Sequence, residues 1–288
     1  MRVFHVAAEQ FVELDAAPAA LPEGGFLWMS CARAEFEQRL AELQGCLQRW
    51  TGGVLVDLHL SDLLNAQLPS HFDDTSAYDL LVFRRLARAP SAEAAADPPA
   101  GVRQALDSID TSPVGFALFD RVLLTVHPAE CAVRDFFAAR LSGHAAGSDL
   151  RGSSRLPTSP AELMLRMVNH MVDGYLDLRR VLTRHLGQLQ QELLDPRGRF
   201  HDWRLLLDAR NTLNLLEDLC EDQRSAVQEW IDALDEWPDE ADAARRRERE
   251  LLRVRSRDVL EHVERVLSHV RRLEHSAETA VQMHFSAL

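Results

Sequence analysis

The C-terminal segment of the chain carries one long amphipathic pattern, which constrains the fold more than any other feature. Its apolar positions recur at heptad spacing, with no glycine or proline between them: Leu252, Val259, Val263, Val266, Val270, Leu273, Ala277 and Ala280. A helix of about 50 residues is about 75 Å long, whereas helices in globular proteins average about 11–12 residues. Such a helix needs antiparallel neighbours or copies of itself to bury its apolar side.

Two other helical segments precede this one. The first starts at the capping box Ser159–Glu162, which has a proline at the first helical position, and ends before the turn Asp195–Gly198. The second runs from about His201 to Glu236 with apolar residues three and four apart. We therefore expect residues 158–288 to form long antiparallel helices that end in a stalk-like helix.

Residues 1–157 mix strand and helix signals. Ala32–Trp50 predicts one amphipathic helix, Ala87–Ala100 an exposed connection and Ser142–Pro157 a linker. Short apolar runs bounded by turn residues predict these strands: Val3–Val6, Gly25–Ser30, Tyr78–Leu86, Val114–Phe119 and Val122–Val126. The expected fold class is α+β, with an N-terminal αβα lobe before the long helices.

Charge and motifs exclude several functions. The chain has 45 Asp and Glu against 32 Lys and Arg, a formal net charge of −13, which argues against nucleic acid and is compatible with divalent cations. The four cysteines lie far apart without a CxxC pair, so they indicate neither a disulfide framework nor a zinc cluster. GxGxxG, GxxxxGK[ST] and GxSxG are all absent. We therefore expect no enzyme, no catalytic residues and no cofactor-binding motif.

The two ends of the chain bear on its relation to a membrane. The N-terminus lacks a signal peptide, and no run of roughly 20 mostly apolar residues could span a bilayer. The sequence reaches Leu288 in helical register without a stop signal. We therefore expect a soluble piece cut from a longer protein.

Three segments follow one another in the order seen in one known family. Leu58–Asn65 and the strand segment Tyr78–Val82 are similar to a stretch written LHPLxLEDxLN and its following strand. Val114–His127 is similar to a strand pair ending in LITV, and Arg257–His262 to the motif RDVxDH of a stalk helix. In these residues the chain resembles the cytoplasmic part of the CorA family of divalent-metal channels, including its ZntB branch.

The resemblance implies a fold and an assembly. In the family, an αβα lobe, two shorter helices and a long stalk helix assemble as a pentamer, and membrane spans with a Gly-Met-Asn loop follow the stalk. These spans would begin shortly after Leu288. The resemblance therefore implies part of a membrane protein, on the cytoplasmic side of the inner (cell) membrane.

The resemblance also implies a function, which is metal sensing and gating for divalent-cation transport. Mg²⁺ is the expected ion, and another divalent cation such as Co²⁺ or Zn²⁺ is the alternative. Ions bound between subunits would hold the assembly closed, because a ligand shifts an equilibrium by its differential affinity. A ZntB-like zinc transporter domain and a soluble helical oligomerisation scaffold without metal remain as alternatives. The implied partners are divalent ions, copies of the chain and the membrane, not nucleic acid.

Asp258 is the first candidate metal ligand, because it matches a family aspartate that contributes to an inter-subunit metal site. Mg²⁺ keeps most of its water and needs only one or two carboxylates. The family's partner acid lies just past the strand Tyr78–Leu86, where this sequence has Ala87–Pro90. The nearest acids are Glu93 and Asp97, so the pair is shifted or lost.

Four acids on the second long helix are further candidates: Glu217, Asp218, Glu221 and Asp222. They form like-charge pairs four residues apart, each destabilising by roughly 0.2–0.5 kcal/mol. A bound divalent ion would relieve this repulsion, and a solvated acidic face is the alternative.

Arginines and histidines also gather on the last helix. The arginines between Arg245 and Arg257 could contact nucleic acid or anionic lipid, but pairing with the acidic helix beside them is the expectation. His262 and His269 lie seven residues apart without HExxH spacing. They do not predict a soft-ligand zinc site, and weak zinc binding through histidine and carboxylate stays open.

Overall fold

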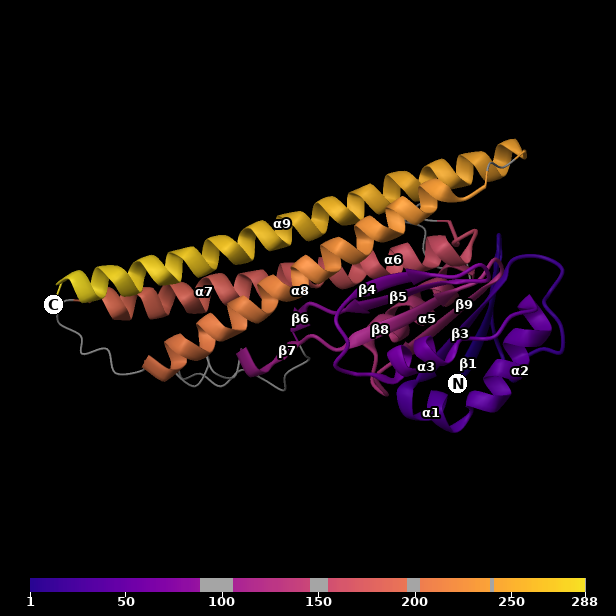
Figure 1. Cartoon of the computed structure of the whole chain (residues 1–288), viewed down its shortest axis with the longest axis horizontal. Coiled ribbons are helices and arrows are strands. Elements are labelled where there is room, and N and C mark those ends of the chain that lie inside the picture. The colour runs from indigo at the N-terminus through magenta and orange to yellow at the C-terminus, as the bar shows by residue number, and fades with distance from the viewer. Residues whose placement is uncertain (89–105, 146–154, 196–202, 239–240, 288) are drawn as a thin grey trace.

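A lobe built on a mixed sheet occupies one end of the molecule, and long helices run from it towards the C-terminus at the other end (Figure 1). The structure is a computed structural model that describes residues 1–88, 106–145, 155–195, 203–238 and 241–287.

The main sheet has seven strands in the order β2-β1-β3-β9-β8-β5-β4. Their bounds are β1 Arg2–Ala7, β2 Gln10–Leu14, β3 Phe26–Ala32, β4 His71–Asp74, β5 Asp79–Arg84, β8 Pro113–Leu118 and β9 Val122–His127. β3 and β9 are parallel, and the other neighbours are antiparallel. Leu27 and Trp28 belong to hydrophobic clusters on opposite faces, because side chains alternate along a strand. The central strands β3, β8 and β9 are mostly apolar, since both of their faces are covered.

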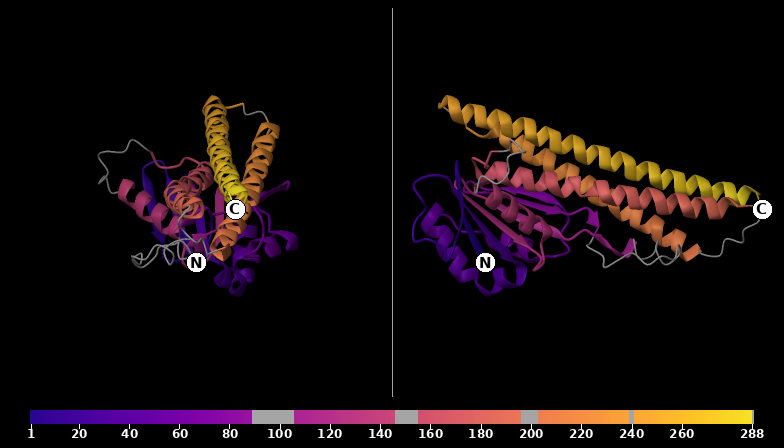
Figure 2. Two further views of the ribbon diagram at one scale, coloured as in Figure 1. Left: turned by 90° about the vertical axis from the view of Figure 1, so that its left-hand side faces the viewer. Right: turned by 180° about the vertical axis from the view of Figure 1, so that it is seen from behind.

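Helices cover both faces of this sheet, which confirms the expected αβα lobe (Figure 2). Phe36, Leu43 and Leu63 pack on one face from three short helices, which are α1 Arg33–Gln38, α2 Leu40–Thr51 and α3 Asp57–Leu64. Phe137 and Leu163 pack on the other face from α5 Ala132–Ala145 and α6 Pro160–Asp173. A separate pair of short strands, β6 Ala87–Arg88 and β7 Ile109–Asp110, lies beside the long helices.

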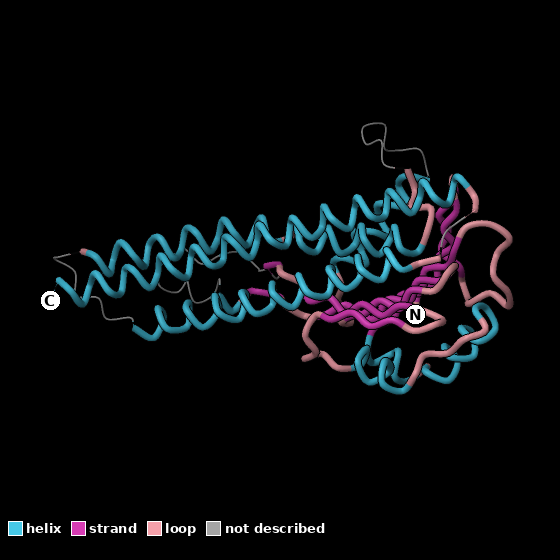
Figure 3. Tube along the Cα trace, turned by 45° about the horizontal axis from the view of Figure 1, so that its top comes forward, coloured by secondary structure: helices cyan, strands magenta, loops and turns pink. Residues whose placement is uncertain are grey.

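Three long helices extend the molecule beyond the lobe: α7 Tyr175–Leu194, α8 Trp203–Glu236 and α9 Ala243–Ala287. α8 runs back towards the lobe, and α9 returns beside α6, α7 and α8 (Figure 3). α9 has 45 residues, which corresponds to about 68 Å. The expected long antiparallel helices and the stalk-like last helix are confirmed.

Two predicted helices are broken in the structure. The segment 32–50 bends at Arg39, whose ψ of 18° leaves the helical region, and Phe36 and Leu43 on either side of the bend both stay fully buried. The segment from Ser159 onwards divides at Gly174 into α6 and α7. A Cβ at Gly174 would lie 3.3 Å from the Met171 carbonyl oxygen, which is tight, and 3.4 Å from the Ala87 side chain of β6.

Several strands were not predicted. β2 and β4 are edge strands with few buried residues, β6 starts the segment expected to be an exposed connection, and β7 pairs with it. The predicted linker Ser142–Pro157 was wrong at its start, since α5 continues to Ala145. Residues 89–105, with Glu93 and Asp97, and residues 146–154 lie outside the described residues.

The hydrophobic core crosses the predicted domain boundary. One cluster contains Trp28 and Phe83 of the sheet together with Trp230 of α8 and Val263 of α9. The division of the chain into 1–157 and 158–288 stays a prediction.

Candidate functional site

A buried carboxylate joins the start of α6 to α9. The Glu162 side chain is 3% exposed and lies 2.7 Å from Arg166, and it also pairs with Arg255 of α9. It accepts hydrogen bonds from the Thr158 backbone N–H at 2.8 Å and the Thr158 hydroxyl at 2.9 Å. Burial raises the pKa of Glu162, but the Thr158 N–H and the two guanidinium groups outweigh it and lower the pKa to about 2. Glu162 therefore stays ionised and holds α9 against α6.

The predicted capping box is confirmed in one of its two bonds. The Ser159 hydroxyl accepts a hydrogen bond from the Glu162 N–H, as a helix N-cap does. The Glu162 carboxylate reaches Thr158 rather than the backbone of Ser159. The same carboxylate also pairs with Arg255 across the helix interface.

Asp258 follows Arg255 by less than one turn of α9, and its side chain is 63% exposed. Its Oδ1 lies 3.9 Å from His262 Nε2 on the next turn. His262 Nδ1 in turn lies 3.7 Å from Asp173 Oδ1 and 3.1 Å from Asn169 Oδ1, both on α6. In the described part of the chain, no three His, Cys, Asp or Glu side chains form a group that could hold a metal ion.

The four acids of α8 separate into two pairs. Glu217 Oε1 lies 2.6 Å from Arg271 Nε of α9, and Arg271 also pairs with Glu221. Arg271 therefore relieves the like-charge repulsion that the sequence predicts for this pair. The second pair is Asp218 and Asp222. Burial and the neighbouring Asp218 raise the pKa of Asp222, and Arg84 only partly opposes this, so the negative charge of this pair is less well compensated than that of Glu217 and Glu221.

The basic segment of α9 pairs in part with α8, the acidic helix expected from the sequence, and in part with α6. Arg249 is 7% exposed and donates hydrogen bonds to the carbonyl groups of Leu234, at the end of α8, and Pro238, just after it. Arg253 lies 2.6 Å from Asp235. These contacts, with the pair between Arg255 and Glu162, fasten the start of α9 to α8 and α6.

The two histidines that the sequence places seven residues apart have different surroundings. His269 is buried and hydrogen-bonded to the Tyr175 hydroxyl. Burial, with Arg179 and Arg272 nearby, lowers the pKa of His269 to about 4, so its ring is neutral at physiological pH. His262 is partly exposed beside Asp258, so it is the one of these two histidines with access to a ligand.

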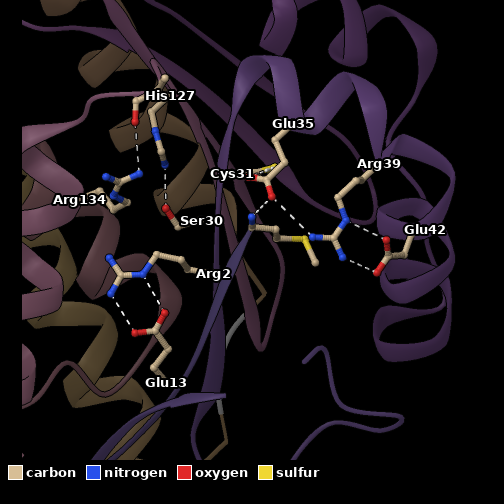
Figure 4. A network of polar contacts seen from close by, with 11 residues as sticks. Arg2, Glu13, Ser30, Cys31, Glu35, Arg39, Glu42, His127 and Arg134 are labelled. Atoms are coloured by element: carbon tan, nitrogen blue, oxygen red, sulfur yellow. Dashed lines mark hydrogen bonds and ion pairs between the residues drawn. The ribbon is translucent and has the colours of Figure 1, made fainter. Parts of the chain in front are cut away.

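A second polar network lies at the end of the sheet (Figure 4). A 2.7 Å hydrogen bond joins Ser30 Oγ to His127 Nε2, and burial lowers the pKa of His127 to about 4. This pair resembles a nucleophile and its base, but Ser30 and His127 are only 2% and 1% exposed. The pair therefore joins β3 to β9 and has no access to a substrate.

Comparisons with known proteins agree with this architecture. The model of the family described as CorA-like Mg²⁺ transporter protein matches residues 54–287. The comparison with curated proteins gives no match. None of the described helices has the length and hydropathy that crossing a membrane requires.

Solved structures share the fold at low sequence identity. The cytoplasmic domain of ZntB from Vibrio parahaemolyticus RIMD 2210633 has a TM-score of 0.56 at 13% identity, over 98% of both chains. The complete CorA magnesium transporter from Methanocaldococcus jannaschii has a TM-score of 0.67 at 13% identity, over 99% of this chain and 76% of that one. The soluble domain of the same CorA has a TM-score of 0.66 at 12% identity, over 99% of this chain and 96% of that one. Since the family model covers most of the sequence, the chain belongs to the family of CorA-like Mg²⁺ transporter proteins.

Proposed function

We propose that this chain is the cytoplasmic metal-sensing and gating domain of a divalent-cation transport protein, with Mg²⁺ as its ion. The observation that carries the proposal is the family match over residues 54–287. Asp258 supports it, because an exposed carboxylate on α9 can bind a hydrated Mg²⁺ that a second copy of the chain completes. The acids of α8 that α9 does not neutralise, Asp218 and Asp222, are secondary ligands in this proposal, and Glu217 and Glu221 are held by Arg271.

The long helix explains how an ion could act at a distance. α9 is one element of 45 residues, and its first third is fastened to α6 and α8. An ion that binds only when copies of the lobe are close would stabilise the closed homo-oligomer, a pentamer in this proposal, by its differential affinity. Loss of the ion would let the lobes separate and move α9 with them, at the cytoplasmic side of the membrane.

Asp258→Ala should remove most of the stabilisation by Mg²⁺. At 100 times its dissociation constant, an ion that binds only the folded form stabilises it by about 2.7 kcal/mol. Thermal unfolding in EDTA and in a Mg²⁺ series measures this shift, and Asp232→Ala, another exposed aspartate of a long helix, is the matched control. The same Mg²⁺ response in Asp258→Ala and wild type would remove Asp258 from the mechanism.

A ZntB-like zinc transport domain is the second candidate, and His262 favours it. Its imidazole lies 3.9 Å from the Asp258 carboxylate, and zinc prefers nitrogen ligands more than Mg²⁺ does. In this case His262→Ala should weaken Zn²⁺ binding about tenfold or more, as loss of a ligand-site group does, and leave Mg²⁺ binding unchanged. Isothermal titration calorimetry with both ions measures this, and His275→Ala on the same helix is the control.

The outcome of that titration separates the candidates. Zn²⁺ binding that depends on His262 favours the zinc domain, and Mg²⁺ binding that depends on Asp258 alone favours the magnesium domain. A chain that forms oligomers by light scattering but binds neither ion would be the helical scaffold instead.

A further inference from the structure

An open pocket of 560 Å³ lies where α5, α6 and α9 meet. This volume is within the range of about 300–1,000 Å³ that is typical of small-molecule sites. Apolar side chains from all three helices line it, among them Phe137, Leu165 and Val259, which belong to the core. The pocket therefore has a rigid apolar wall.

The polar side of this pocket is rich in arginine. Its lining includes Arg140, Arg155, Arg166 and Arg255, against two aspartates, in a chain whose formal net charge is −13. We call it the arginine pocket. Glu162, which is not part of the lining, pairs with Arg166 and Arg255 and offsets one of their two positive charges. Arg140 and Arg155 are exposed at the rim, and neither forms an ion pair with a residue in the described ranges.

Two planar side chains, Phe136 and His170, lie beside the arginines of the pocket. The Phe136 ring stacks on the His170 ring with centroids 4.1 Å apart and an interplanar angle of 9°. The Arg140 guanidinium carbon lies 5.7 Å from the centroid of the same Phe136 ring. Burial, opposed by Asp173, lowers the pKa of His170, so its ring is a neutral flat surface at physiological pH.

We propose that the arginine pocket binds a nucleotide. Arginine forks match phosphate oxygens, and aromatic and guanidinium planes stack on bases. Asp173 and Asp258 also line the pocket, and their carboxylates would repel a simple anion but accept hydrogen bonds from a base amine or sugar hydroxyls. A ligand that carries phosphate, a flat ring and hydrogen-bond donors fits all three parts of the lining.

The position of the arginine pocket favours a soluble nucleotide over a lipid headgroup. It lies beside the lobe, and 29 residues of α9 separate Asp258 from the end of the helix at Ala287, which is about 44 Å. In the proposed function the bilayer lies at the far end of α9, too far away to bring its phosphates to Arg140. A bound nucleotide would bridge α5 and α6 of the lobe to α9.

Calorimetric titration of ATP in EDTA, without divalent ions, tests the proposal. The wild-type chain should bind ATP saturably, and Arg140→Ala/Arg155→Ala should bind it about tenfold more weakly or worse, because charge-assisted hydrogen bonds to phosphate are lost. Both arginines are exposed, so the fold should persist, and circular dichroism checks this. The matched control is Arg246→Ala/Arg265→Ala, exposed arginines of α9 that do not line the pocket.

Adenosine and inorganic pyrophosphate test the nucleoside part and the phosphate part of the ligand one at a time. Each should bind at least about tenfold more weakly than ATP, since each satisfies only one part of the lining. Pyrophosphate binding as tight as ATP binding would show a polyphosphate site and overturn the nucleotide proposal. So would the absence of ATP binding, or equal ATP binding by the Arg140→Ala/Arg155→Ala variant. The Mg²⁺ response at Asp258 is measured without nucleotide, so either proposal can fail alone.

Discussion

Replacing Glu162 with glutamine will destabilise the protein by about 3–5 kcal/mol, because one partner of a buried ion-pair network is removed. The carboxylate is 3% exposed and forms ion pairs with both Arg166 and Arg255. Glutamine keeps the shape of the side chain but leaves two guanidinium groups without their counter-charge. It also weakens the acceptor for the Thr158 N–H at the start of α6.

Urea unfolding of both proteins across a pH series measures this effect. The folded pKa of about 2 lies below the ordinary value of 4.5, so the contribution of Glu162 is full above about pH 4.5 and is lost as the pH falls towards 2. The difference between wild type and Glu162→Gln should therefore shrink below pH 4.5. Glu261→Gln, an exposed acid of α9, should change stability by less than about 0.5 kcal/mol. A loss of under 1 kcal/mol in Glu162→Gln, or a loss independent of pH, contradicts this role.

Trp230→Ala will destabilise the protein by a similar amount, about 3–5 kcal/mol, because a large core side chain is lost and leaves a cavity. Trp230 of α8 is 1% exposed and packs edge-on against Phe72 of β4 and Trp237. Its Nε1–H donates to Ser256 Oγ of α9 at 2.8 Å. One side chain therefore connects the sheet, α8 and α9.

Trp230→Phe is the matched control for this prediction. Phenylalanine retains most of the apolar area but loses the hydrogen bond to Ser256, so it should lose about 1–2 kcal/mol. Chemical denaturation of wild type, Trp230→Ala and Trp230→Phe measures the free energy of unfolding of each. If the alanine and phenylalanine variants were equally stable, packing at Trp230 would not be what holds the helices to the lobe.

The elements that could be predicted from the sequence are those whose pattern is local. Central strands such as Val122–His127 are mostly apolar and buried throughout because both faces of the sheet are covered, and α9 shows its heptad directly. The edge strand Gln10–Leu14 has Phe11 as its one buried residue, so it has no comparable signal. The breaks at Arg39 and Gly174 depend on what packs beside them, which the local pattern does not contain.

The candidate site, too, contains residues that have a local sequence signal and residues that only tertiary contacts bring together. Asp258 could be proposed because a short motif resembles a known family. The Glu162 carboxylate was identified as part of a capping box, but its partner Arg255 lies 93 residues further along the chain. Asn169 and Asp173 carry no signal of their own and become part of the site only because α6 packs on α9. Tertiary contacts of this kind cannot be read from spacing.

Thermal unfolding of the wild-type chain in EDTA and in increasing Mg²⁺ tests the central claim most directly. If the chain senses divalent cations, its unfolding temperature will rise as the Mg²⁺ concentration increases. The free energy of unfolding should increase by about 2.7 kcal/mol at 100 times the dissociation constant, as expected for a ligand that binds only the folded form. A wild-type unfolding temperature that is the same in EDTA and in saturating Mg²⁺ would contradict the proposed function.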